Sequence, residues 1–266
     1  MTSLTLAVDA LAPHIVAVAL IGSRLVPVAF LCPLLGGQHA PTHVKLGVVL
    51  TLALFLHLGA NVGPPDGGRL SLLAVGWAVK EAVLGTTIGL VASLPFDAAR
   101  MGGRFIDLFR GSSAEAALPL AGTKEAASGD ALYYVLLGSG ASGAVLPLVM
   151  GALFRSYAWV PLGSFVHTED VSLEAARLVG GAFATGLALG APIAALSLAV
   201  DSLLGLASRA ASGMNLQDTA APLRILGGGW VLWLAVGLLA ARLQEYALET
   251  PGALRQVMAL GGVGTR

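Results

Sequence analysis

The segment LCPLLGGQHAPTHVKLG, residues Leu31 to Gly47, lies between two strongly apolar stretches of the chain. Proline and glycine readily end helices, so the segment predicts a turn between two separate apolar helices. The residues of this structural turn are Pro33, Gly36, Gly37, Pro41 and Lys45.

The composition of the whole chain is that of a membrane protein. Of 266 residues, 56% are hydrophobic and 11% are charged, whereas ordinary soluble domains carry about 25% charged residues. So few charges could not cover the surface of a soluble protein of this size. Fifteen basic and fifteen acidic side chains cancel, so no basic excess points to nucleic acid. The single cysteine, Cys32, excludes an internal disulfide.

Six apolar helical units follow from the uncharged stretches, since about 17 or more apolar residues can span a bilayer. We therefore expect an all-α integral membrane protein whose helices are in several places broken by glycine or proline. The four uncharged stretches are Leu46–Pro65, Ala131–Phe154, Leu178–Val200 and Ile225–Ala241. The two stretches interrupted by charges are Ala10–Leu35 and Leu70–Phe96.

Small residues recur at helical spacing inside these units. Gly85 and Gly89 form one such pair, and Gly186 and Gly190 form another. Small side chains let helix backbones approach closely in a membrane. The spacing favours packing within the chain, and packing against copies of other subunits is the alternative.

Four charged residues lie in or beside apolar helices, where a charge is costly and needs a partner or water. They are expected to be buried charges: Arg24, Glu81, Asp201 and Arg209. Lys80 precedes Glu81 directly, and neighbours on a helix point about 100° apart. We therefore expect separate partners for these two side chains and not a tight mutual pair.

The segment FDAARMGGRFIDLFRG ends in a long polar loop. Asp97, Arg100, Arg104 and Asp107 are spaced by 3, 4 and 3 residues, so they form a polar stripe on one helical face. Such a stripe suits a solvated channel, a seam between subunits, or a helix with one wet side. After Gly111 the chain stays mostly small and polar as far as Asp130, and a loop of this length in a compact protein is either disordered or has a function of its own.

The order of these motifs resembles the FliR/SctT family of type III secretion export-gate proteins. The first block reads R-x-x-P-x-x-F-x-x-P-x-x-G-x-x-x-x-P-x-x-x-K from Arg24 to Lys45. The later blocks are KEAVLGTTIGLVASLPFDAARMGGRFIDLFRGSS, SYAWVPLGSF and APIAALSLAVDSLLGLASRAASGMNL. The last block lacks the proline that the family often has before its Met-Asn pair. Arg110 before Gly111 resembles the injectisome branch more than the flagellar one.

The resemblance implies an architecture. Residues 1–170 would form an N-terminal helical region, and residues 171–266 a C-terminal helical hairpin. The loop 110–130 would lie inside a closed pore as part of a plug, and the turn at Cys32–Lys45 would aim one helix away from the next and set the curvature of the assembly. The implied plug residues are Arg110, Gly111, Ser112, Ser113, Leu118, Pro119 and Leu120.

The resemblance also implies partners and a location. The partners would be FliP/SctR-like and FliQ/SctS-like export-gate subunits and a FliB/SctU-like switch protein, in the bacterial inner (cytoplasmic) membrane. The chain would line a conduit for unfolded protein substrates, and it would be no enzyme: no catalytic set, metal site or cofactor motif emerges from the residues. A flagellar export-gate subunit or a small solute transporter or channel are the alternative functions.

Overall fold

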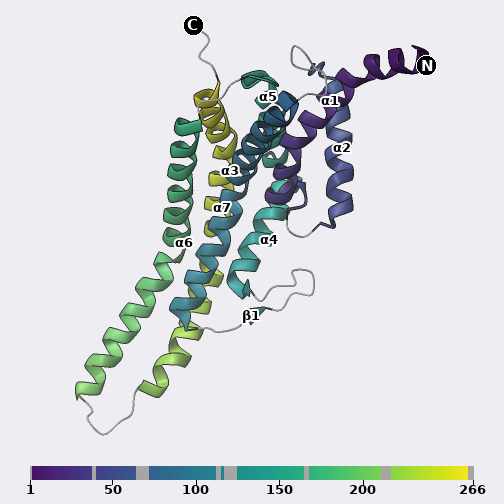
Figure 1. The fold of residues 1–266 in the computed structure, drawn as a ribbon. Coiled ribbons are helices and arrows are strands. Elements are labelled where there is room, and N and C mark those ends of the chain that lie inside the picture. Colours follow the sequence, from purple (N-terminus) through teal and green to yellow (C-terminus); the bar gives the residue numbers. More distant parts are fainter. Residues whose placement is uncertain are drawn as a thin grey trace. The chain divides into compact units, whose positions relative to one another are not determined.

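The computed structural model is almost entirely helical (Figure 1) and describes residues 2–37, 40–63, 72–111, 115–116, 125–164, 168–210 and 217–262. Its elements are α1 (Thr2–Leu31), the 3-10 helix η1 (Pro33–Leu35), α2 (Thr42–Leu58), α3 (Leu72–Arg110), α4 (Ala127–Ser142), α5 (Val145–Trp159), α6 (Thr168–Ala210) and α7 (Gln217–Gly261). Two two-residue strands, β1 (Glu115–Ala116) and β2 (Glu125–Ala126), pair antiparallel. The expected all-α class is confirmed.

The chain divides into two compact units, and each is built from segments distant in sequence. The first unit comprises Met1–Ser93, Ala144–Leu178 and Leu248–Arg266, and the second comprises Leu94–Gly143 and Val179–Ala247. The division between residues 1–170 and 171–266, which the resemblance implies, concerns the assembled gate and stays a prediction.

In the first unit, α1 packs beside α2 (Figure 1) and against the N-terminal part of α3. Leu20, Ile21 and Leu25 are buried on one side of α1. The Tyr157 hydroxyl of α5 donates a hydrogen bond of 3.1 Å to the Ile21 carbonyl oxygen, which ties α5 to α1. A core of this kind forms where one face of an apolar helix packs against other helices of the same unit.

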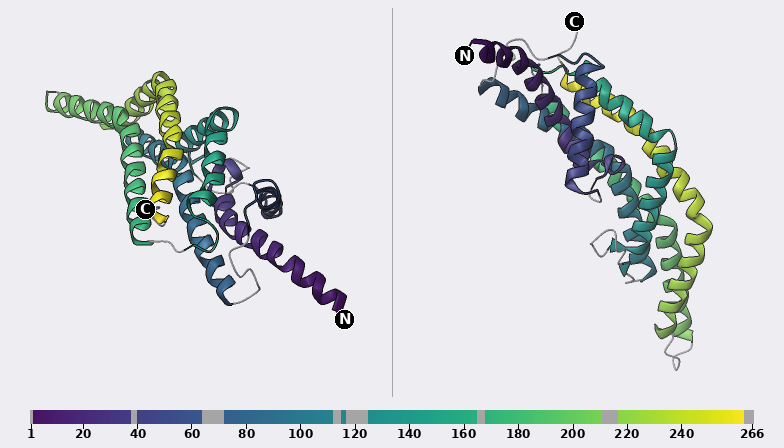
Figure 2. Two further views of the ribbon diagram at one scale, coloured as in Figure 1. Left: turned by 90° about the horizontal axis from the view of Figure 1, so that it is seen from above. Right: turned by 90° about the vertical axis from the view of Figure 1, so that its right-hand side faces the viewer.

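In the second unit, residues 94–110 of α3 lie between α4 and α6. A Cβ on Gly103 would overlap the backbone of Gly129 in α4, and one on Gly102 would come within 2.9 Å of the Leu189 side chain in α6. Residues 179–210 of α6 and 217–247 of α7 form the two arms of a hairpin, seen in green and yellow-green in Figure 2. The tip of the expected hairpin, residues 211–216, lies outside the described residues.

The turn after α1 has the backbone that its glycines allow. Gly36 and Gly37 adopt φ of 113° and 45°, in the left-handed region that side chains disfavour. A Cβ on Gly37 would also come within 2.9 Å of the Pro33 Cα. Pro41 caps the start of α2, and the Lys45 ammonium lies 4.4 Å from the centre of the Phe30 ring. The described part of this turn, Pro33 to Gly37, is therefore sterically constrained, and the role of the turn in the assembly stays a prediction.

One expected helix is broken. The stretch Ala131–Phe154, predicted as a single span, falls into α4 and α5, which are separated at Gly143 and Ala144. Gly143 is extended at φ −109° and ψ −156°, and the glycine- and serine-rich sequence GSGASG before Ala144 has little helix propensity to oppose the break. Among the described residues, four helices are long and apolar enough to cross a membrane, or five if this broken pair counts as one.

Candidate functional site

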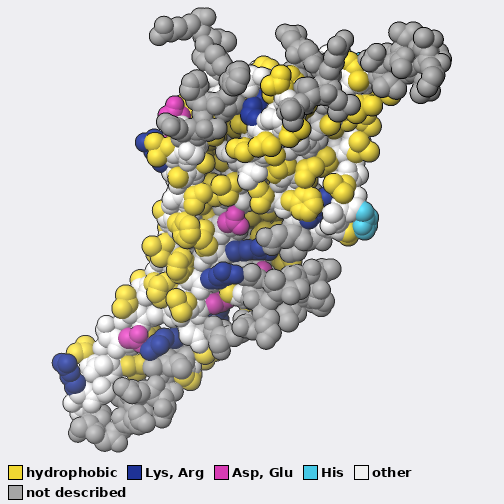
Figure 3. All heavy atoms as spheres, viewed as in Figure 1, with side chains coloured by type: hydrophobic (Ala, Val, Ile, Leu, Met, Phe, Trp, Pro, Cys, Tyr) yellow, Lys and Arg dark blue, Asp and Glu magenta, His cyan; other side chains and the backbone are white. Residues whose placement is uncertain are grey.

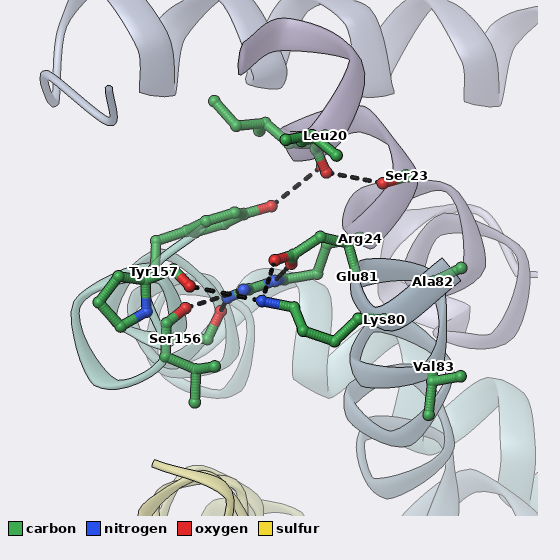
Figure 4. A network of polar contacts seen from close by, with 12 residues as sticks. Leu20, Ser23, Arg24, Lys80, Glu81, Ala82, Val83, Ser156 and Tyr157 are labelled. Atoms are coloured by element: carbon green, nitrogen blue, oxygen red, sulfur yellow. Dashed lines mark hydrogen bonds and ion pairs between the residues drawn. The ribbon is translucent and has the colours of Figure 1, made fainter. Parts of the chain in front are cut away.

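A buried cation lies at the centre of the first unit. Arg24 of α1 has no exposed surface, and its Nε donates a hydrogen bond of 2.5 Å to Glu81 Oε2 in α3. Its two terminal nitrogens donate to Ser156 Oγ at 3.2 Å and to the Val160 carbonyl oxygen at 2.8 Å. Figure 4 shows these groups converging on the guanidinium, with the Tyr157 ring 4.2 Å from its carbon. One guanidinium thereby joins α1, α3 and α5.

Lys80 and Glu81 form the tight pair that helical geometry argued against. Lys80 Nζ lies 2.7 Å from Glu81 Oε1, so the expectation that these two side chains form no tight mutual pair is wrong, although each also has a partner of its own. The long lysine side chain folds back over the helix, and its ammonium also donates to the Ser164 carbonyl oxygen at 3.1 Å. Glu81 is fully buried, whereas 17% of the Lys80 side chain is exposed. The Glu81 carboxylate therefore pairs with two cations, the fully buried Arg24 and the partly exposed Lys80.

The small residues of α3 let its backbone approach α1 closely beside this network. A Cβ on Gly85 would overlap the Arg24 carbonyl oxygen, and one on Gly89 would lie 3.1 Å from the Val28 Cα. The predicted close approach of Gly85 and Gly89 is therefore confirmed as packing within the chain. The same holds for the second pair, since a Cβ on Gly186 would meet Met101 at 3.0 Å and one on Gly190 would meet Phe105 at 2.9 Å.

The polar stripe of α3 faces α4 at two of its four members. Asp107 is buried, and its carboxylate accepts hydrogen bonds from Ser128 Oγ at 2.6 Å and from the Ser128 backbone N–H at 2.9 Å. The Arg100 guanidinium carbon lies 4.0 Å from the centre of the Tyr133 ring. Asp97 is partly buried and Arg104 is exposed. The stripe thus serves packing within the unit at Arg100 and Asp107, and its role in a pore stays a prediction.

Arg110, the last residue of α3, reaches across to α7. Its side chain is 17% exposed and lies against Gly228, where a Cβ would overlap the Arg110 Cγ and come within 3.1 Å of its Cδ. Gly227, Gly228 and Gly229 are consecutive, although each glycine inside a helix costs about 1 kcal/mol relative to alanine. The glycines at 228 and 229 therefore open a notch in α7 that the arginine side chain fills.

Among the described residues, Arg110 finds only long polar contacts. One terminal nitrogen lies 3.5 Å from the Ile225 carbonyl oxygen, and the other lies 3.6 Å from Asp107 Oδ1. Its Nε is buried and has no hydrogen-bond partner there. The guanidinium lines an apolar groove of about 460 Å³, together with Trp230 and Trp233.

Some of the remaining predicted site residues are exposed in the structure, and others lie outside its described part. Asp201 and Arg209 are exposed within this chain, so their expected burial is wrong for the chain alone. Asp201 pairs with Arg224 of the other arm at 2.5 Å. Gly111 ends α3 with φ of 67°. Ser112, Ser113, Leu118, Pro119 and Leu120 of the predicted plug lie outside the described residues.

Several contacting residues were missed by sequence reasoning. Ser156, Tyr157 and Val160 belong to the block SYAWVPLGSF, which was noted only for its resemblance. His14 Nδ1 and His57 Nε2 lie 2.9 Å apart between α1 and α2, and no spacing rule pairs residues so distant in sequence. The notch beside Arg110 did carry a signal, because three successive glycines in an apolar helix are compatible with a close neighbour there.

Comparison with known proteins gives relatives along most of the chain. The family described as "Bacterial export proteins, family 1" matches residues 15–250. The flagellar biosynthetic protein FliR of Bacillus subtilis (strain 168) is 23% identical over 235 residues, which cover 87% of this chain and 90% of that protein. The Yop proteins translocation protein T of Yersinia pestis is 31% identical over 189 residues, covering 68% of this chain and 70% of that protein.

Proposed function

Because the chain belongs to the bacterial export proteins, family 1, we propose that it is a subunit of a type III export gate. In this proposal it forms, with partner membrane subunits, a closed conduit that carries unfolded substrates across the bacterial inner membrane. The partners are FliP/SctR-like, FliQ/SctS-like and FliB/SctU-like proteins. One structural observation supports the proposal most, namely the length and exposure of the two hairpin arms.

The arms are too long to be covered by lipid alone. Residues 179–210 of α6 extend about 48 Å at 1.5 Å per residue, and the hydrocarbon core of a bilayer is about 30 Å thick. Fitting such a helix inside that core would need a tilt above about 50°, whereas membrane helices tilt by about 0–40°.

Apolar side chains nevertheless remain exposed along both arms, and Figure 3 shows hydrophobic side chains over the flank of α6. Those of α6 are Phe183, Leu187, Leu198, Leu203 and Leu206, and those of the α7 arm are Leu223, Ile225, Leu226, Trp230, Trp233, Leu234, Val236 and Leu238. Exposed apolar patches of this kind mark interaction surfaces. Neighbouring polypeptides would cover the part of each arm that lies beyond the lipid.

Native mass spectrometry of the gently solubilised complex tests this function. A tagged full-length chain is expected to appear as one copy among unequal numbers of two small helical membrane proteins. A stable lone monomer that transports a small solute in liposomes would refute the proposal and favour the transporter alternative.

The plug role of the loop needs a separate experiment. Deleting residues 111–122 removes most of the predicted plug while leaving α3 and α4 intact. We expect the deletion to make cells leak small ions or dyes, with the complex still assembled. Unchanged leakage in an assembled complex would remove the plug role and leave the subunit role standing.

The two branches of the family differ in what the gate serves. Arg110 before Gly111 favours an injectisome over a flagellum, and relatives of both kinds are similar to this chain. Deleting the gene should therefore abolish secretion of effector proteins while motility persists. Loss of motility with normal effector secretion would assign the chain to the flagellar system.

A further inference from the structure

We propose that the groove around Arg110 receives an apolar helix of a neighbouring gate subunit, and that this helix presents an aspartate or glutamate to the Arg110 guanidinium. The inference rests on the proposed function, since it names how one neighbour is held. It starts from the arginine itself, whose side chain is mostly buried and whose polar contacts within the described chain are long.

A buried guanidinium needs acceptors. Arginine carries five N–H donors, and a buried charge without a close partner is strongly disfavoured. Asp107 is the nearest carboxylate in the described chain, yet both of its oxygens accept hydrogen bonds from Ser128. Its 3.6 Å distance to Arg110 is longer than a hydrogen bond. The Nε of Arg110 has no hydrogen-bond partner among the described residues, so an acceptor from outside the described chain would complete its contacts.

Contacts with α7 hold the Arg110 guanidinium in place. The arginine stem occupies the notch at Gly228, and its terminal nitrogen lies beside Gly229, where a Cβ would come within 3.4 Å. An alanine at 228 would displace the stem. The notch thus holds the charged head at the edge of the groove, where an incoming group can reach it.

The rest of the groove suits an apolar helix. Its lining includes Ile225, Leu226, Trp230 and Trp233, and the two tryptophan rings stand edge to face with centroids 6.0 Å apart. The tryptophans are exposed at 67% and 69%. Tryptophan and arginine are enriched among the residues that dominate protein interfaces. Apolar walls with one unsatisfied cation are complementary to an apolar helix that carries one carboxylate.

Photocrosslinking in membranes that contain the whole apparatus tests the inference. A photoreactive phenylalanine analogue replaces Trp230 in the full-length chain, and the adduct is identified by peptide sequencing. We expect a peptide from an apolar helix of another gate subunit that contains an aspartate or glutamate. Arg110→Gln and Gly228→Ala should each lower the adduct yield at least about tenfold, because losing one member of a buried charge pair weakens association strongly.

Gly227→Ala is the matched control, because a Cβ there meets only the Leu196 side chain at an ordinary 3.5 Å. Its adduct yield should equal that of the parent. If Gly228→Ala fails to accumulate, a charge exchange replaces it: Arg110→Glu should abolish the adduct, and arginine at the crosslinked acid of the partner should restore it.

Other adducts would overturn the inference. A phospholipid adduct would mean that a lipid headgroup is the acceptor, and an adduct within residues 112–124 would mean that the chain's own loop is. A yield unaffected by Arg110→Gln would also refute it. A separate measurement distinguishes the two proposals. If the partner subunits co-purify with a tagged parent chain, the proposed function stands even when the inference about the groove fails. If they do not co-purify, the proposed function itself is refuted.

Discussion

Replacing Glu81 by glutamine keeps the shape of the side chain but removes the charge that faces Arg24. Arg24 has no exposed surface, so its charge would be left in the interior without an anion among the described residues. Breaking a buried ion pair by removing one partner costs about 3–5 kcal/mol. The melting temperature of the purified chain in mild detergent should fall by about 6–20 °C, at about 2–4 °C per kcal/mol.

Cys32 supplies the assay for this loss. It is the only cysteine in the sequence and is fully buried in the first unit. A thiol-reactive dye therefore reports the unfolding of that unit without an engineered cysteine. Lys80→Gln is the control: Arg24 still faces the Glu81 carboxylate in that variant, so the loss of stability should be smaller than for Glu81→Gln.

The double variant Arg24→Met with Glu81→Met separates charge from shape. It should be more stable than either single variant, because apolar replacement of both partners removes the buried charges together. A Glu81→Gln protein that melts within about 2 °C of the parent, against the about 6–20 °C expected, would refute the reasoning. So would a double variant less stable than both single ones.

Three further predictions follow from single contacts. Gly85→Ala forces a Cβ onto the Arg24 carbonyl and should cost about 1–3 kcal/mol, measured by the same melting assay. Asp107→Asn removes the charged acceptor of Ser128 and should cost about 1.5–3 kcal/mol, measured as lost hydrogen-exchange protection at the start of α4. Cys32 is fully buried, so maleimide labelling of the folded chain should be negligible at pH 7 and should proceed only when the first unit unfolds. Fast labelling at pH 7 would contradict it.

The sequence predicted the helical class and the positions of most helices, because long uncharged stretches in a membrane leave few other structures. It also predicted the close approach at Gly85 and Gly89, since small residues at helical spacing have few other uses in apolar helices. It did not predict the break at Gly143. An apolar stretch with several glycines and serines is compatible with both a continuous and a broken helix, and neighbouring contacts decide between them.

The partners of the buried charges lay beyond sequence reasoning for a different reason. Arg24 was recognisable from the sequence as a cation inside an apolar helix. Its acceptors, however, come from α3 and from the end of α5, between 57 and 136 residues further along the chain. The pair of Lys80 and Glu81 was excluded because backbone directions were applied to a side chain long enough to fold back. Asp201 and Arg209 were expected to be buried because their helices are apolar, yet an apolar helix of one subunit can be exposed until partners bind.

The central arginine of the first unit and Arg110 of the second differ in how closely acceptors approach them. In the first, Arg24 and Glu81 are buried together, and each finds its counterion within the chain. The second leaves Arg110 short of acceptors beside an apolar groove, on arms that are themselves largely exposed. A neighbouring subunit that supplied a carboxylate to Arg110 would shorten these contacts and cover the apolar groove at the same time. We therefore expect a neighbour to bind at this groove.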